Sequence, residues 1–124
     1  MKICVTAKGS TLDSPVDPRF GRCAYFIIVE PETLDFTAIE NPHAEAMGGA
    51  GIQSGQLISE KGATVLLTGN VGPNAYQTLE AGGIAVITGV SGSVESAVRA
   101  FSRGELTPNN GATVSSHHGM KSGE

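Results

Sequence analysis

A short run of aromatic and β-branched residues, Tyr25 to Val29, constrains the fold of this chain more than any other segment. A continuous apolar run of this length, bounded by turn residues, is typical of a strand buried on both faces of a sheet. Turn residues over 31–35 follow it, and a second strand pattern begins directly afterwards, from Phe36 to Glu40. A connection this short requires the two strands to pair as an antiparallel hairpin.

The rest of the chain alternates between strand and helix patterns. A first strand over 3–7 precedes the hairpin, and Ser93 and the glycines at 62, 82, 83 and 104 mark helix ends. The resulting order, β-β-β-α-β-α-β-α, predicts an α/β protein with helices on both faces of a mixed five-stranded sheet, a three-layer arrangement like the ribonuclease H fold. The first, third and fourth strands then end at one edge of the sheet, where the second begins. Open α/β sheets bind ligands at such an edge.

Length and composition narrow the classes of function. We expect one domain over residues 1–104 and a mobile polar tail over 105–124, which carries His117, His118 and Met120. A net charge of −4 argues against binding to nucleic acid, which needs a basic surface. No apolar run reaches the roughly 20 residues that span a membrane, and no signal peptide is evident, so a cytoplasmic location is expected. The two cysteines are then expected to stay reduced.

Three candidate binding residues lie in the loop between the first two strands. Arg19 and Arg22 could clamp an anion through their guanidinium groups, or one of them could pair with Asp13 or Asp17 to hold the loop together. Cys23, beside Arg22, could be a thiolate of lowered pKa that binds a soft metal, or a half-buried and inert cysteine.

Further candidates follow the third strand and the fourth. His43 could be a metal ligand or an exposed loop residue. Gly48, Gly49 and Gly51 open a helix whose amides could cradle an anion, or they allow close packing. Asn70 belongs to a turn that either contacts a ligand or caps the next helix. His117 and His118 form a weaker candidate metal site.

No catalytic constellation is recognisable in the chain. A nuclease on a ribonuclease H fold needs several acidic residues at the sheet to hold two metal ions, and the first and fourth strands contain none. A serine nucleophile elbow is also missing. We therefore expect a protein that binds rather than an enzyme.

Several motifs in order resemble the dinitrogenase iron–molybdenum cofactor-binding family over roughly residues 1–103. The residues that carry this resemblance are Met1 to Val5, Val16-Asp-Pro-Arg-Phe-Gly-Arg-Cys23, Glu40-Asn-Pro42, Gly48-Gly-Ala-Gly51, Gly69-Asn-Val-Gly-Pro73 and Gly82-Gly-Ile84. The resemblance implies a ribonuclease H-like fold without nuclease activity, and binding of iron–sulfur or iron–molybdenum clusters or their precursors. It also implies that the Arg19–Arg22 loop and the region around His43 contact the cluster.

The leading hypothesis is a metallocluster carrier that works during cofactor assembly, as a monomer or weak dimer, with an assembly scaffold or a P-loop ATPase as partner. The alternative is a regulatory or docking module without cofactor, which works with a cluster-loading ATPase. An enzyme acting on a phosphorylated small molecule is the third and weakest hypothesis.

Overall fold

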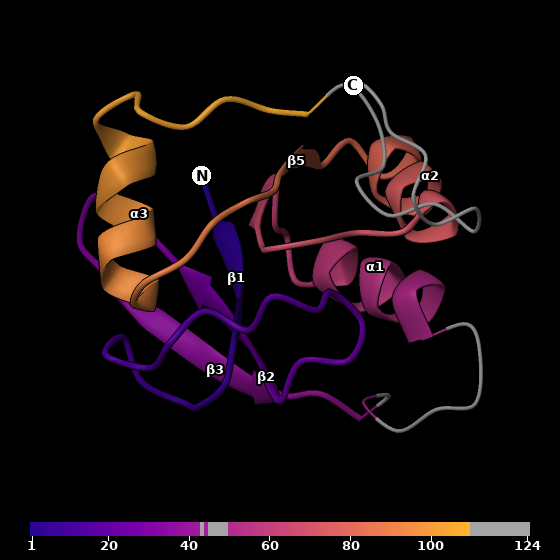
Figure 1. The fold of residues 1–124 in the computed structure, drawn as a ribbon, viewed down its shortest axis with the longest axis horizontal. Helices are drawn as coiled ribbons and strands as arrows, with labels where there is room; N and C mark the ends of the chain where they lie inside the picture. Colours follow the sequence, from indigo (N-terminus) through magenta and orange to yellow (C-terminus); the bar gives the residue numbers. More distant parts are fainter. Residues whose placement is uncertain (43, 45–49, 110–124) are drawn as a thin grey trace.

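The computed structural model describes residues 1–42, 44 and 50–109. Eight elements follow one another along the chain (Figure 1): β1 (Ile3–Ala7), β2 (Tyr25–Val29), β3 (Phe36–Glu40), α1 (Ala50–Glu60), β4 (Val65–Leu67), α2 (Pro73–Ala81), β5 (Ala85–Ile87) and α3 (Val94–Ser102). The predicted order of elements is confirmed. Within the described ranges, no helix is long and apolar enough to cross a lipid bilayer.

The five strands form one mixed sheet in the order β3-β2-β1-β4-β5. β2 pairs antiparallel with both β1 and β3, whereas β4 runs parallel to β1 and β5 runs parallel to β4. The predicted hairpin is therefore β2–β3. Because of these directions, β1, β3, β4 and β5 all end at the edge of the sheet where β2 begins.

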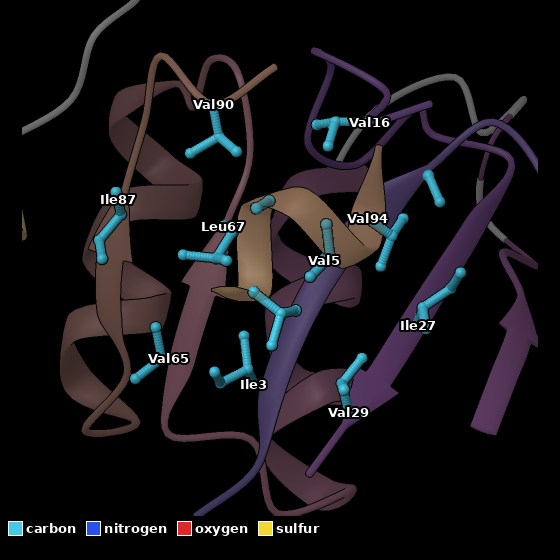
Figure 2. Packing of buried hydrophobic residues seen from close by; sticks show 13 residues of the cluster. Ile3, Val5, Val16, Ile27, Val29, Val65, Leu67, Ile87, Val90 and Val94 are labelled. Carbon is cyan, nitrogen blue, oxygen red and sulfur yellow. The ribbon is translucent and has the colours of Figure 1, made fainter. Parts of the chain in front are cut away.

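Each face of the sheet packs against its own hydrophobic core. Ile3 and Val5 of β1 belong to the core on one face, together with Val94 of α3, and Cys4 belongs to the core on the other face. Figure 2 shows α3 above the first core, with Val94 close to Val5. The second core includes Ile58 of α1 and Leu79 of α2. The three-layer arrangement is confirmed, and burial on both faces explains why the sequences of β2, β4 and β5 are continuously apolar.

The segment from Glu105 to Asn109, which we call the strap, crosses from the α3 side of the molecule to the α2 side (Figure 1). Leu106 packs on the core beneath α3, and the backbone amide of Asn109 donates to the carbonyl of Val86 in β5 at 2.7 Å. The part of the chain that the sequence assigns to a tail therefore begins with a segment in which Glu105, Leu106 and Asn109 contact the domain. The domain boundary at residue 104 stays a prediction.

Candidate functional site

The loop between β1 and β2 folds back over the carboxyl ends of the central strands. The Thr6 hydroxyl, in β1, donates to the carbonyl of Asp17 at 2.6 Å and lies 2.8 Å from the hydroxyl of Thr68, which follows β4. The amide of Asp17 donates back to the carbonyl of Thr6 at 2.9 Å. All three residues are buried, so these bonds fix the height of the loop above the sheet edge.

The same loop is bound to the turn between β4 and α2. The amide of Asn70 donates to the carbonyl of Pro18 at 2.7 Å, and the amide of Phe20 donates to the carbonyl of Asn70 at 3.2 Å. Gly69 permits this approach, because a Cβ atom there would lie 2.5 Å from the Cα of Pro18. The backbone of Asn70 thus has a structural role. A ligand contact of its exposed side chain stays a prediction.

Arg19 pairs with a buried carboxylate. Its Nε and one terminal nitrogen donate to the two carboxylate oxygens of Asp17 at 3.2 and 3.3 Å, and its backbone amide donates to one of them at 3.1 Å. Asp17 has almost no exposed surface, whereas the Arg19 side chain is 64% exposed. Of the two alternatives for Arg19, the structure therefore shows the ion pair that holds the loop together. Most of the positive charge of Arg19 offsets the negative charge of Asp17.

Arg22 is the arginine of this loop whose positive charge is available to a ligand. Its side chain is exposed, and one terminal nitrogen donates to the carbonyl of Ala44 at 3.1 Å. Among the residues described, no carboxylate forms an ion pair with it. The bond to Ala44 also brings the loop against the segment that follows β3.

Cys23 is fully buried, and Asn41 covers the loop around it. The Asn41 side-chain amide donates to the carbonyls of Gly21 and Cys23 at 3.1 and 2.9 Å. Burial, followed by the negative charge of Asp17, raises the pKa of Cys23 to about 12. Of the two alternatives for Cys23, the structure therefore favours the inert cysteine, because desolvation raises the pKa of this thiol more than the guanidinium group of Arg19 lowers it. A role for Cys23 as a metal ligand is untested.

The raised pKa of Cys23 predicts a loss of stability in alkaline solution. The folded protein keeps this thiol proton at pH values where the unfolded chain loses it, above about pH 9. The free energy of unfolding should then fall as the pH rises from about 9 toward 12, by up to roughly 1.4 kcal/mol per pH unit from this group. Urea unfolding between pH 7 and 10.5 measures how the free energy of unfolding changes with pH. This slope should be less steep for Cys23→Ala, which retains Cys4. Equal slopes for the two proteins would contradict the burial of this thiol.

Glycines bring the loop and both amino-terminal helix ends together. Gly21, with φ of +94°, lies so close to α1 that a Cβ atom there would be 3.1 Å from the amide nitrogen and Cα of Gly51. A Cβ atom on Gly51 would lie 2.8 Å from the Cβ of Ala75 in α2. Of the two alternatives for Gly51, the structure shows close packing, and an anion contact through its amide remains a prediction.

A hollow of about 310 Å³ opens between these elements. It is lined by Phe20, Gly51, Ile52, Gly72, Pro73, Asn74 and Ala75. The first turns of α1 and α2 both contribute to it, and no side chain caps α2, because its N-cap residue is Gly72. None of the lining residues is acidic, and helix amino termini carry partial positive charge. The hollow is therefore suited to an anion.

A second depression, of about 570 Å³, includes Glu40, Asn41 and Ala44, the residue to which Arg22 donates. The carboxylate of Glu40 makes it a poorer site for an anion. Within residues 1–42, 44 and 50–109, no group of three or more histidine, cysteine, aspartate or glutamate side chains could hold a metal ion. His43, Gly48, Gly49, His117 and His118 lie outside the described residues, so the roles predicted for them are untested.

Sequence patterns alone do not identify two of the residues that build this site. They indicate Asn41 only as part of a strand break, and Phe20 only as a spacer between the arginines. Asn41 carries one usable signal, because a polar residue directly after a partly apolar strand can hydrogen-bond to a neighbouring loop. Phe20 packs 6.0 Å, between ring centroids, from the buried Phe26, and thereby anchors the loop in the second core.

Known structures share this architecture. The apo form of the orange protein from Desulfovibrio gigas is 41% identical, with a TM-score of 0.88 over 90% of this chain and 95% of that one. A Thermotoga protein provisionally described as a NifB protein is 37% identical, with a TM-score of 0.75 over 86% of this chain and 91% of that one. A relative found by sequence, an uncharacterized protein of Methanocaldococcus jannaschii, is 33% identical over 86% of this chain and 89% of its own length.

The sequence model of the family described as dinitrogenase iron-molybdenum cofactor matches residues 1–104, and this confirms the resemblance seen in the sequence motifs. The match covers every strand and helix of the fold and the loop that holds Arg19, Arg22 and Cys23. The chain therefore belongs to the dinitrogenase iron-molybdenum cofactor family.

Proposed function

We propose that this protein binds a preformed, anionic metal–sulfur cluster of the iron–sulfur or iron–molybdenum type in the hollow and passes it on during cofactor assembly. Family membership supports binding related to such a cofactor. The observation that carries the proposal is the meeting of two helix amino termini at a hollow without acidic lining. Phe20 lines this hollow and belongs to the same loop as Arg22, which has no carboxylate partner among the described residues.

Charge and hydrogen bonding, rather than protein thiolates, would hold the cluster. Cys23 is buried and keeps its proton at neutral pH, so it is a poor ligand in this conformation. A cluster whose own sulfides complete the coordination of its metals needs few protein ligands. Helix amides and Arg22 would then balance its negative charge. His43 could add one coordinate bond, which is weak enough to break at transfer.

The cluster is cargo in this proposal, and the protein is not an enzyme. We propose a cofactor-assembly scaffold or a P-loop ATPase as its partner and a monomer or weak dimer as its state. A reducing compartment such as the cytoplasm fits two free, buried cysteines. The open shape of the hollow suits a ligand that must be released intact.

Substitution of Arg22 tests the proposed site. Arg22→Ala should lower the affinity for a cluster reconstituted anaerobically from iron, sulfide and molybdate by roughly 10-fold or more, because charge-assisted hydrogen bonds contribute about 1.5–3 kcal/mol. Titration of the charge-transfer absorption measures this affinity. The matched control is Arg99→Ala, which removes an exposed arginine from α3 on the opposite face and should leave the affinity unchanged.

Two outcomes would contradict the proposal. A protein that stays colourless under all these conditions does not bind such clusters, and equal loss of affinity in both variants would place the site elsewhere. A pull-down with a cluster-loading ATPase, unchanged by Arg22→Ala and His43→Ala and independent of any cluster, would favour the docking module instead.

A further inference from the structure

We propose that β3 is a docking edge for a partner protein, which adds an extended segment with carboxylate side chains to the sheet as a sixth strand. The surface beside β3 lies at the end of the sheet where β2 stops and β3 starts, whereas the hollow lies toward the end where β2 begins. The inference goes beyond the proposed function, because it requires no cluster and can be tested with a peptide.

The outward backbone groups of β3 have no partner in the part of the chain that the structure describes. β3 pairs with β2 and is the outermost strand on the side of the sheet that carries Ile27 in Figure 2. The amide of Asn41 donates to the carbonyl of Ala24 at 2.9 Å, in the register of the two strands, so these two residues form a hydrogen-bonded pair. Such pairs alternate along an antiparallel ladder. The residues that direct their amides and carbonyls away from β2 are therefore Phe36, Ala38 and Glu40.

The two edges of the sheet differ in how they are protected. At the other edge, β5 has only three residues, and the amide of Asn109 in the strap donates to the carbonyl of Val86 at 2.7 Å. Short strands, covering segments, lysine and proline are the usual means of blocking an edge strand. β3 has five residues and contains neither lysine nor proline. Its backbone therefore remains able to pair with an extended segment from another protein.

Two lysines beside β3 determine the charge of that segment. Lys2 and Lys61 line a trough of about 140 Å³, together with three residues of β2 and β3, which are Ile28, Thr37 and Ile39. Within residues 1–42, 44 and 50–109, no carboxylate forms an ion pair with either lysine. Side chains of an added strand alternate between the two faces of the sheet, so every second one lies on the face of this trough. Carboxylates at those positions complement the two lysines.

The surroundings also fix where the carboxylates belong. Glu30 and Asp35 lie in an adjoining trough of about 210 Å³ at the hairpin turn, which contains Lys2 but not Lys61. Carboxylates of the partner are therefore expected toward Lys61, away from the turn. Phe36 is 42% exposed and lies on the opposite face of β3 from the trough residues Thr37 and Ile39. An apolar side chain of the partner segment covers it best.

A second copy of this chain fits the edge less well. If β3 paired antiparallel with itself about Ala38, Thr37 would lie opposite residue 39 of the other copy, and no carboxylate would enter the trough of the lysines. The net charge of −4 on each copy also opposes self-association. Charge complementarity therefore favours a different protein, with a segment in which carboxylate and apolar side chains alternate.

Hydrogen exchange with a synthetic peptide tests the pairing. The probe is a peptide in which valine and glutamate alternate, and the matched control is a peptide in which valine and lysine alternate. The glutamate peptide should slow the exchange of the amides of Phe36, Ala38 and Glu40, measured by NMR, whereas those of Thr37 and Ile39, which face β2, should change little. Absence of protection, or protection without this alternation, would overturn the docking edge.

Ala38→Pro removes an outward amide from the middle of β3. Since this amide does not bond to β2, the fold should persist, and the glutamate peptide should bind about tenfold more weakly or worse in an anisotropy titration. Undiminished binding would overturn the strand pairing. Protection of the same amides without peptide, which increases with protein concentration, would assign the edge to a second copy and overturn the proposed partner.

Lys61→Glu tests the charge preference without changing β3. This variant should bind the glutamate peptide about fivefold more weakly and should bind the lysine peptide more tightly than the unsubstituted protein does. The control Lys8→Glu reverses an exposed lysine that follows β1 and should leave both affinities unchanged. Equal affinity of the unsubstituted protein for the two peptides, or equal effects of the two substitutions, would overturn the assignment of an acidic partner.

Discussion

Gly69→Ala should lower the free energy of unfolding by about 3 kcal/mol and the melting temperature by roughly 10 °C. A methyl group at this position would meet the Cα, Cβ and carbonyl oxygen of Pro18 at 2.5, 2.7 and 2.8 Å. These are backbone and ring atoms, which no side-chain rotation can move away. The turn after β4 must therefore separate from the loop, with loss of the hydrogen bond from Asn70 to Pro18. Thermal unfolding measured by circular dichroism tests this.

The control for this variant is Gly104→Ala. Gly104 has φ of +77°, but no atom lies within 4 Å of the place that a methyl group would take, so the substitution adds only backbone strain of about 1–2 kcal/mol. A Gly69→Ala protein that melts at or above the temperature of Gly104→Ala would show that the loop does not lie against this turn. A protein that is destabilised more strongly agrees with the close contact.

Asn41→Leu should cost about 2–4 kcal/mol of stability, because the leucine has a similar volume but donates no hydrogen bond. The carbonyls of Gly21 and Cys23 then lose their shared donor in a buried position, at about 1–3 kcal/mol for each unsatisfied group. The loop that carries Arg22 should also loosen. Urea unfolding measures the stability, and proteolysis between Phe20 and Arg22 reports the loosening.

Gln77→Leu provides the matched control, because it replaces an exposed amide on α2 with the same apolar side chain. We expect a change within about 0.5 kcal/mol and no new cleavage in the loop. Equal stability of the two variants would mean that the Asn41 amide does not hold the loop. In that case the position of Arg22 would depend on its bond to Ala44 instead.

Most of the fold was predictable because its signals are local. The runs at 3–7, 25–29 and 36–40 coincide with β1, β2 and β3, since each is apolar or β-branched and bounded by turn residues. Ser93 caps α3 as expected, through a reciprocal pair of bonds with Ser96. β4 and β5 have three residues each, and Thr64 and Thr68, which flank β4, are still hydrogen-bonded to Ala85 and Ile87 of β5.

The sequence predicted where in the fold the candidate residues lie, but not the role of each residue. Sequence position placed Arg19 and Arg22 in one loop and left open which of them had a carboxylate partner; the fold gives Asp17 to Arg19. The sequence also left open whether Cys23 is a reactive thiolate or an inert cysteine; its side chain lies in the second core, where burial dominates its pKa. Burial depends on what packs above a residue, and neighbours in the sequence do not reveal it.

The sequence by itself determined the order of the elements, the directions of the strands and the edge at which the loops meet, because periodicity, turn chemistry and crossover handedness act over a few residues. Only the tertiary structure decided that Asn41 holds the loop, that Gly21 and Gly51 let the helix ends approach, and that Asn109 closes against β5. Each of these contacts joins residues more than 15 positions apart, and their strength depends on the distance and burial that the packed sheet and helices impose.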